Sequence, residues 1–229
     1  MSEAIPEMSE STRVKISGFI EREFGIKMPP VKKTLLTSRL GKRLSVSGCA
    51  NFEEYFNYVN SPEGLAREIF VFADLVSTHE TSFFREAQHF ELLHNKILPT
   101  LMNDKGPDKG LRIWSAGCST GEEAYSIAIM CEVFAAENGI RNFPYKIIGT
   151  DISTKVLDAA RRAVYNAERV RNVPPAYDRF IMRSRDPETD LVRIVPEIRA
   201  KMAFHILNLL QETYAFDESF DIIFCRNTL

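Results

Sequence analysis

A turn of small residues at 116–121 (A-G-C-S-T-G) has the composition of a ligand-binding loop. Side chains this small would let a ligand approach the backbone closely, as happens where a strand turns into a helix in open α/β sheets. The turn reads G-x-x-x-G rather than G-x-G-x-x-G, which argues against a nicotinamide or flavin site. Taken alone, it could equally serve only as a tight strand-to-helix connection.

Asp151 follows a second apolar segment, at a position where a carboxylate could accept hydrogen bonds from both hydroxyls of a ribose. It could equally cap the helix that follows. Together, Asp151 and the turn at 116–121 favour an adenosine-containing ligand without a pyrophosphate.

Glu122 and Glu123 come directly after the turn and have two interpretations. Ser119 with Glu122, and Thr120 with Glu123, each fit a capping box, and acidic residues suit the start of a helix. Alternatively, one of the two carboxylates pairs with a cationic amino group of the ligand. S-adenosylmethionine has such a group and NAD lacks it.

A further polar cluster occupies 77–86, where Arg85 follows two phenylalanines. As a bare pattern it is a polar loop leading into a helix, with Arg85 capping or pairing at the surface. A last polar group, 225–227 (C-R-N), follows the final apolar segment of the chain.

The elements that must position these residues change in kind along the chain. From 14 to 96 the apolar spacing is helical, and it predicts helices ending at Gly25, over 32–44, over 52–59 after Asn51, and from Pro62 to Val76. The stretch 103–110 has no apolar residue and is predicted to be a loop.

After residue 110 the pattern alternates between strands and helices. It predicts strands at 111–115, 145–150, 202–207 and 220–225, with helices at 122–138 and 153–162. Such a series predicts a parallel sheet with right-handed crossovers. The polar, proline-rich segment 163–197 reads as an insertion with one strand, 191–195. We therefore expect an α/β architecture divided into a helical domain (1–100), a linker (101–110) and a sheet domain (111–229).

Composition limits the classes of partner and compartment. The chain has 229 residues, with 29 Lys and Arg against 31 Asp and Glu, so its near-neutral charge gives no general attraction to nucleic acid. We find no signal peptide and no run long enough to span a membrane. Its cysteines show neither C-x-x-C nor metal-ligand spacing, so we expect a cytoplasmic protein without disulfides, metal or membrane insertion. They are Cys49, Cys118, Cys131 and Cys225.

Five successive motifs make the sequence similar to the CheR chemotaxis receptor methyltransferases. They are 78–86 (T-H-E-T-S-F-F-R-E), 114–126 (W-S-A-G-C-S-T-G-E-E-A-Y-S), 149–153 (G-T-D-I-S), 208–210 (N-L-L) and 224–227 (F-C-R-N). The helical segment 19–59 resembles the N-terminal domain of the same family. The fold implied is a helical domain followed by a class I, Rossmann-like methyltransferase domain with a small β insertion.

The resemblance implies transfer of a methyl group from S-adenosylmethionine to glutamates on the cytoplasmic helices of chemoreceptors, with S-adenosylhomocysteine as the product. Arg85 would orient the incoming carboxylate and contact the cofactor, Glu122 would hold the cofactor's amino group, and Asp151 its ribose. His79 stands where many members have Asn. The remaining cofactor residues implied are Thr81, Gly117, Asn208, Leu209, Arg226 and Asn227.

The resemblance also bears on receptor binding. In the family, a basic helix is thought to meet the acidic methylation helices of the receptor; here the basic residues could equally be ordinary solvated charge. They are Lys32, Lys33, Arg39, Lys42 and Arg43. The insertion resembles a β-subdomain that docks a receptor C-terminal peptide in some members, but its loop 183–190 lacks the glycines we would look for.

Two alternative functions stay open, and the chain differs from the family pattern at its C-terminal end. The chain could be a non-catalytic paralogue that binds chemoreceptors or senses S-adenosylmethionine, or, less favoured, a dinucleotide-dependent oxidoreductase. The family continues with further strands after its Arg-Asn, whereas this chain stops at Leu229. We therefore expect a shortened chain in which the strand 220–225 is an exposed edge.

Overall fold

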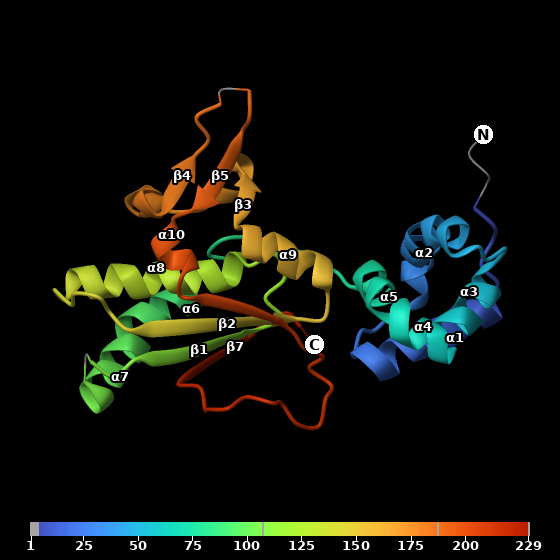
Figure 1. Ribbon diagram of the computed structural model, residues 1–229, viewed down its shortest axis with the longest axis horizontal. Coiled ribbons are helices and arrows are strands. Elements are labelled where there is room, and N and C mark those ends of the chain that lie inside the picture. Colours follow the sequence, from blue (N-terminus) through green and yellow to red (C-terminus); the bar gives the residue numbers. More distant parts are fainter. Residues whose placement is uncertain (1–4, 107, 187, 229) are drawn as a thin grey trace.

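The computed structural model describes residues 5–106, 108–186 and 188–228. Pro107 in the expected linker, Pro187 in the insertion loop and the terminal Leu229 lie outside the described residues. Figure 1 shows an all-helical part at the N-terminal end, an α/β part, and a small group of strands that projects from the α/β part.

The all-helical part is built from five helices around an aromatic core. Phe19 and Phe72 pack edge to face in this core, with ring centroids 5.7 Å apart. Ser9, Asn51 and Ser61 cap three of the helices through their side-chain oxygens. The five are α1 (Glu10–Phe24), α2 (Lys33–Ser47), α3 (Phe52–Val59), α4 (Pro62–Arg67) and α5 (Ile69–Val76).

The single helix predicted from Pro62 to Val76 is wrong, because α4 and α5 are separate helices that meet at Glu68. The carboxylate of Glu68 is buried, where it accepts hydrogen bonds from Arg43 (Nη2–Oε2 2.8 Å) and from the Tyr55 hydroxyl (2.9 Å). A buried carboxylate needs such partners. The break coincides with this tertiary contact, which apolar spacing does not report.

The α/β part contains a parallel sheet of four strands in the order β6-β2-β1-β7, which confirms the predicted sheet. All four carboxyl ends lie at one edge of the sheet. In Figure 1, helices α8 (Glu122–Glu137) and α9 (Thr154–Arg162) lie above it, and the segment 207–221 passes beneath. The strands are β1 (Leu111–Ala116), β2 (Tyr145–Asp151), β6 (Met202–Ile206) and β7 (Ile222–Cys225).

Within the described residues, β7 is an edge strand, as expected from its position in the chain. Its residues alternate between buried and exposed, and the Ile223 side chain is largely exposed. Within β7, Ile222 and Phe224 therefore pack on one face, while Ile223 and Cys225 on the other face are exposed.

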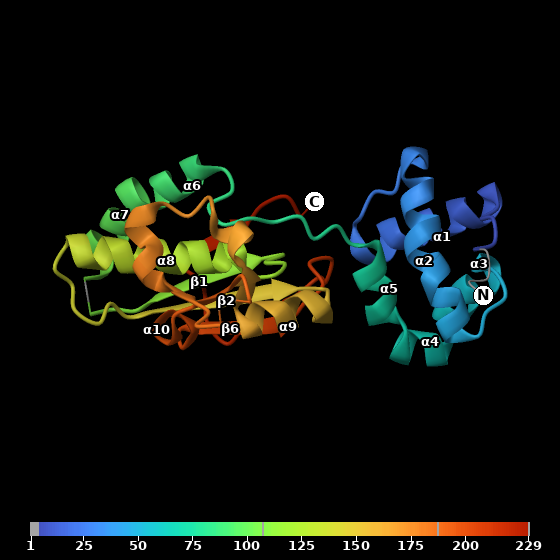
Figure 2. The same cartoon turned by 90° about the horizontal axis from the view of Figure 1, so that it is seen from above.

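The helical segment that precedes the sheet belongs to the α/β core. It comprises α6 (Ala87–Leu92), a π-helical turn (Leu93–Ile97) and α7 (Leu98–Lys105). Phe90, Leu93 and Leu98 are buried with the sheet residues, and Figure 2 shows α6 and α7 beside α8, apart from α1 to α5. Helix α7 reaches Lys105, so the loop predicted from residue 103 begins three residues too early. We propose that the two domains meet between Val76 and Phe83 rather than near residue 100.

The insertion forms an antiparallel sheet of its own, in the order β3-β5-β4. Only β5 (Leu191–Ile194) matches a predicted strand. The other two, β3 (Val164–Asn166) and β4 (Ile181–Arg183), have three residues each, too few to show an alternating pattern. Short helical turns at Ala167–Val170, Pro175–Phe180 and Pro196–Arg199 complete the insertion.

Candidate functional site

A cavity of about 450 Å³ lies at the carboxyl ends of the sheet strands. This is the usual position and size for a ligand site in an open α/β sheet. Nine of the ten cofactor residues expected from the sequence line it, although they come from separate stretches of chain. The nine are His79, Thr81, Arg85, Gly117, Asp151, Asn208, Leu209, Arg226 and Asn227.

Asp151 ends β2 with its carboxylate at the cavity wall. Its Oδ2 accepts the backbone N–H of Ser119 at 2.9 Å and its Oδ1 that of Ser153 at 3.0 Å. Ser153, not Asp151, is the N-cap of α9. Burial raises the pKa of Asp151, while the backbone donors of Ser153 and Ser119 oppose that shift. Each oxygen keeps a lone pair that a ligand hydroxyl could use.

The turn at 116–121 presents backbone to the cavity. Gly117 has φ +71°, where glycine is favoured, and a Cβ at this position would overlap the Thr228 side chain. Ser119 also has a positive φ (48°), and its hydroxyl donates to the His79 carbonyl at 3.2 Å. The turn is therefore tied directly to the polar loop 77–86.

The loop 77–86 forms one wall of the cavity, and side chains of the α/β part hold its backbone at four points. Ser119 Oγ donates to the carbonyl of residue 79 and Arg169 Nη2 to that of residue 81, at 3.2 and 3.1 Å. Ser126 Oγ accepts the N–H of residue 84 at 3.0 Å, and Arg226 Nη2 donates to the carbonyl of residue 85 at 2.6 Å. The wall is thus fixed by contacts far apart in sequence.

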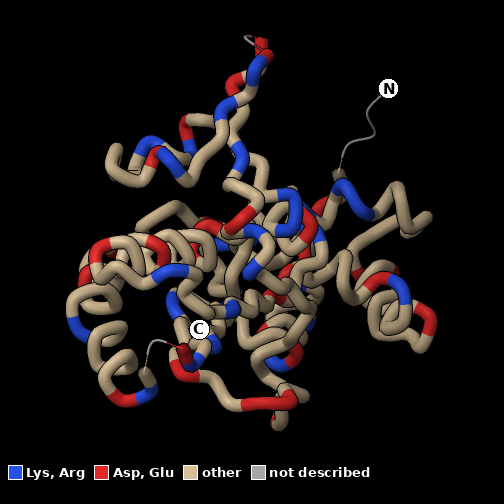
Figure 3. The backbone as a smooth tube through the Cα atoms, turned by 60° about the vertical axis from the view of Figure 1, so that its left-hand side comes forward, with Lys and Arg blue, Asp and Glu red and all other residues tan. Residues whose placement is uncertain are grey.

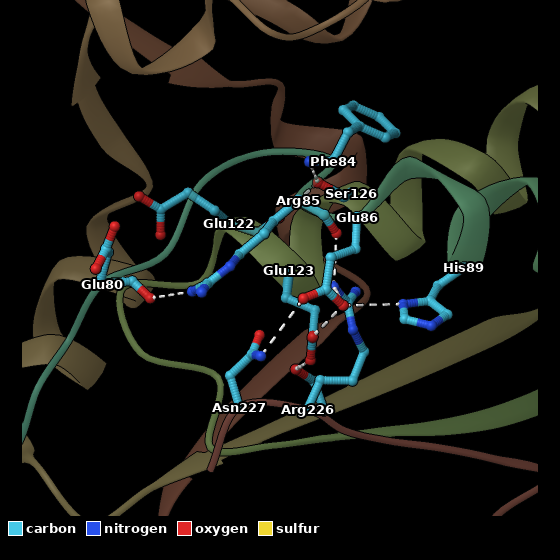
Figure 4. Close-up of polar contacts among 11 residues, drawn as sticks. Glu80, Phe84, Arg85, Glu86, His89, Glu122, Glu123, Ser126, Arg226 and Asn227 are labelled. Carbon is cyan, nitrogen blue, oxygen red and sulfur yellow. Dashed lines mark hydrogen bonds and ion pairs between the residues drawn. The ribbon is translucent and has the colours of Figure 1, made fainter.

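The backbone on both sides of Arg85 is left-handed. Phe84 has φ 53° and Glu86 has φ 59°, conformations that residues with a side chain rarely adopt. Such strain persists only where surrounding contacts enforce it, and it is concentrated at functional sites. The Arg85 guanidinium donates to the Glu80 carbonyl at 2.8 Å within the same loop and remains partly exposed (Figure 4).

Arg226 lies between two acidic side chains below this loop, as Figure 4 shows. Its Nη2 is 2.9 Å from Glu86 Oε2, and its Nη1 is 3.6 Å from Glu123 Oε2. The Nε of Arg226 is buried and has no hydrogen-bond partner among the described residues. Asn227 also contacts Glu86, at 3.5 Å. Arg226 therefore supports the Arg85 loop as well as lining the cavity.

Glu122 is the one expected cofactor residue that does not line the cavity. Its side chain is fully buried, where it pairs with Arg169 and accepts the Thr120 hydroxyl at 2.6 Å. Its neighbour Glu123 does line the cavity and accepts the Ser115 hydroxyl at 2.7 Å. Burial raises the pKa of Glu123. The carboxylate that faces the ligand space thus belongs to Glu123.

Asn208 joins the two domains. Its Nδ2 donates to the Glu23 carbonyl, in the last turn of α1, at 2.7 Å, and its Oδ1 accepts the Leu210 N–H at 3.0 Å. The helical domain also supplies part of the cavity wall, through 24–27 and Lys32. Sequence reasoning missed this contribution, because no motif in 24–27 signals a ligand.

Two of the five residues of the expected basic face point inward. Arg39 donates to the carbonyls of Leu75 and Ser77 at 3.1 and 2.7 Å, and Arg43 pairs with buried Glu68. Lys42 is exposed and Lys33 half-buried. Charges of both signs are scattered over the whole molecule, including the projecting insertion (Figure 3).

Comparison with known families identifies the family of the chain and its cofactor. The CheR methyltransferase SAM-binding domain matches residues 79–229, and the CheR methyltransferase all-alpha domain matches residues 14–72. The chain belongs to the CheR methyltransferase family. It is a methyltransferase whose methyl donor is S-adenosylmethionine, so the expected family, fold and cofactor are confirmed.

Individual CheR relatives are similar over most of this chain. A chemotaxis protein methyltransferase of Borreliella burgdorferi is 40% identical over 92% of this chain and 74% of the relative. Chemotaxis protein methyltransferase 2 of Pseudomonas aeruginosa is 38% identical over 90% and 70%, and the Escherichia coli enzyme is 34% identical over 97% and 74%. None of the described helices is long and apolar enough to cross a bilayer.

The lining of the cavity fits S-adenosylmethionine. The Gly117 turn offers close backbone approach, Asp151 offers acceptors for ribose hydroxyls, and Glu123 offers an anion for the cofactor's ammonium group.

Proposed function

We propose that this CheR protein transfers the methyl group of S-adenosylmethionine to glutamate side chains on the cytoplasmic helices of chemotaxis receptors, giving glutamate methyl esters. The observation that carries the proposal is the convergence of nine expected residues, from separate motifs, on one cavity. The family assignment supports methyl transfer in chemotaxis, and the glutamate acceptor is the finer step that we add.

The chemistry suits a site without a metal or a strong base. The bound cofactor supplies an electrophilic methyl group attached to a sulfonium. When the methyl group is transferred, the sulfur leaves as the neutral thioether of S-adenosylhomocysteine, which is a good leaving group. A glutamate carboxylate is already a nucleophile at neutral pH, so the protein has to bring the two groups into line and exclude water. The Arg85 guanidinium can orient an incoming carboxylate without a proton transfer.

The expected residues that line the cavity, together with Glu123, each have a proposed role. Asp151 accepts the ribose hydroxyls, and Glu123, in place of Glu122, pairs with the ammonium group. Arg85 contacts the cofactor and orients the substrate carboxylate, which makes it the catalytic residue. The other expected residues in the lining complete the cofactor pocket: His79, Thr81, Gly117, Asn208, Leu209, Arg226 and Asn227.

We propose that the acidic receptor helices meet the lysines of the basic face rather than its arginines. Lys32 lies at the cavity and Lys42 is exposed, whereas Arg39 and Arg43 donate to groups of the helical domain itself. Electrostatic complementarity of this kind acts mainly on the association rate and on specificity.

The test is incubation with S-adenosylmethionine labelled in the methyl group and a receptor cytoplasmic fragment. A glutamate ester releases labelled methanol on treatment with base, and a matched fragment with Gln at the acceptor positions is the control. We expect volatile label from the first fragment and none from the second. Binding of S-adenosylhomocysteine without any base-labile label would favour the non-catalytic paralogue and contradict the proposal.

A further inference from the structure

Two side chains at the base of the β insertion reach the cofactor loops. Arg169, in the turn Ala167–Val170, extends one nitrogen, Nη2, toward the Thr81 carbonyl at 3.1 Å, the Thr120 hydroxyl at 3.5 Å and the Glu122 carboxylate. Tyr165, in β3, donates its hydroxyl to the Thr120 carbonyl at 2.8 Å.

The same region is packed as well as hydrogen-bonded. The Tyr165 ring meets the fully buried Phe83 ring edge to face, with centroids 5.2 Å apart. Phe83 belongs to the loop 77–86 and Thr120 to the turn at 116–121, two backbone segments that both contribute residues to the cavity wall. The insertion therefore contacts both segments and joins them.

Arg169 provides the charged part of this connection. Glu122 is fully buried at the first position of α8, while the Arg169 side chain is 42% exposed and approaches it from the insertion. Because the carboxylate is buried, it holds the guanidinium in one place, and the guanidinium in turn holds the Thr81 carbonyl. Of the four side chains of the α/β part that hold the loop 77–86, Arg169 is the one that comes from the insertion.

We propose that Arg169 is a positioning residue for the cofactor: anchored on Glu122, it fixes the Thr81 wall of the cavity against the Gly117–Gly121 turn. It does not line the cavity itself. The β insertion thereby takes part in cofactor binding, and Glu122 contributes through Arg169 rather than by contact with the ligand. This inference rests on the proposed assignment of the cavity to S-adenosylmethionine.

The first test compares Arg169→Ala, Arg169→Lys and Arg171→Ala in calorimetric titrations with S-adenosylhomocysteine. Arg171 lies two residues away, is largely exposed and pairs with Glu168, so it is the matched control. We expect Arg169→Ala to weaken binding roughly tenfold, the effect of losing one charge-assisted hydrogen bond. Arg169→Lys should recover part of the affinity and Arg171→Ala should bind like the wild type. Equal affinity in all four proteins would overturn the proposal.

The second test separates positioning from general destabilisation. In the double variant Arg169→Ala/Glu122→Gln no charge remains buried without a partner, so thermal stability should partly return. Affinity for S-adenosylhomocysteine should stay low, because the Thr81 carbonyl still lacks its hydrogen bond from Arg169. Recovery of affinity in the double variant would show that the unpaired Glu122 charge, and not the loop, caused the defect, and would contradict the proposal.

A third measurement needs no ligand. Hydrogen exchange of the amides in 78–86 should accelerate in Arg169→Ala and stay unchanged in Arg171→Ala, with α1 to α5 unaffected in both. If Arg169→Ala does not fold, Arg169→Lys, which keeps a cation beside Glu122 and loses the guanidinium bond to the Thr81 carbonyl, carries the same comparison with a smaller effect. Unchanged exchange in the loop would overturn the proposal. If the wild-type protein does not bind S-adenosylhomocysteine, the assignment of the cavity to the cofactor is refuted instead.

Discussion

Asp151 lies at the cavity wall, where two backbone donors hold its carboxylate and leave its outward lone pairs available. The two backbone N–H groups of Ser119 and Ser153 fix the carboxylate plane, and burial raises its pKa above that of an exposed aspartate. The cap role considered from the sequence is filled by Ser153. Of the two roles that the sequence left open for Asp151, the structure thus excludes the cap, and ligand binding is the role that we propose.

Replacing Asp151 should weaken cofactor binding and change its pH dependence. Asp151→Asn removes an acceptor for ribose hydroxyls and should cost about 1–3 kcal/mol in S-adenosylhomocysteine affinity. In the wild type the ionised carboxylate binds the ligand, so affinity should fall as the pH is lowered through the raised pKa, beginning above the usual Asp range.

The pH dependence of stability has the opposite sign for this residue. A carboxyl whose pKa is raised by folding favours the unfolded state once it ionises, so its contribution to stability declines as the pH rises from the unfolded pKa toward the folded one. Calorimetric titrations and unfolding curves at several pH values measure both effects. An acid-side loss of affinity that persists unchanged in Asp151→Asn would assign it to another group.

Arg85 should matter more for transfer than for binding. Its guanidinium is partly exposed toward the cavity, and its internal bond is to the Glu80 carbonyl, which leaves other donors for a substrate carboxylate. We expect Arg85→Ala to lower kcat roughly 10- to 100-fold, the loss of a charge-assisted hydrogen bond, with a much smaller change in S-adenosylhomocysteine affinity. Equal losses in the two measurements would place Arg85 in cofactor binding alone.

Among the secondary elements, the junction of α4 and α5 contains a buried ion pair between Glu68 and Arg43. Glu68 is 3% exposed. Burial alone would raise its pKa, but hydrogen bonds from Arg43 and Tyr55 outweigh burial and lower it. The stability contributed by a lowered carboxyl pKa is present above the unfolded value and is lost as the pH falls through the folded value.

Arg43→Ala should therefore destabilise the helical domain by about 3 kcal/mol, because it leaves a buried carboxylate without its cation. Lys42→Ala, at the exposed neighbouring position, should change stability by no more than about 0.5 kcal/mol. Urea unfolding followed by circular dichroism measures both. Similar stability of the two variants would show that Arg43 is surface charge, as the sequence allowed.

The elements that the sequence predicts well are those whose signals are local. Gly25 ends α1 and Asn51 caps α3, and the apolar runs of β1 and β2 locate the sheet. The elements missed depend on distant contacts: the Glu68 break needs Arg43 and Tyr55, and the three-residue strands β3 and β4 need β5 between them. Local pattern cannot report such partners.

The candidate site follows the same division. Residues at strand ends, such as Asp151 and Arg226, are located by the sheet itself and were predicted. The choice between Glu122 and Glu123 depends on which side chain Arg169 covers, and Arg169 lies in an insertion with no recognisable motif. The left-handed backbone at Phe84 and Glu86 could not be predicted, because neither residue is a glycine.

At the scale of the whole molecule, the cofactor cavity lies where the two domains meet. Asn208, after β6, donates to the Glu23 carbonyl in the last turn of α1, one of the carbonyls that a helix leaves without an internal partner. Gly25 and Leu210 approach each other at the same junction: a Cβ on Gly25 would lie 3.3 Å from the Leu210 side chain. These contacts between the two domains place residues 24–27 in the cavity wall.

Asn208→Asp should therefore weaken cofactor binding through the domain junction. The aspartate keeps the acceptor for the Leu210 N–H, loses the donor to the Glu23 carbonyl and sets an anion against it, whereas Asn208→Ala loses both bonds. We expect S-adenosylhomocysteine affinity to fall roughly 5- to 10-fold in both variants, with faster hydrogen exchange at 24–27, since one interdomain hydrogen bond is worth about 1 kcal/mol and the repulsion adds to it. If Asn208→Asp instead retains wild-type affinity and exchange while Asn208→Ala does not, the Leu210 contact alone matters, and the helical domain does not control the cavity through Asn208.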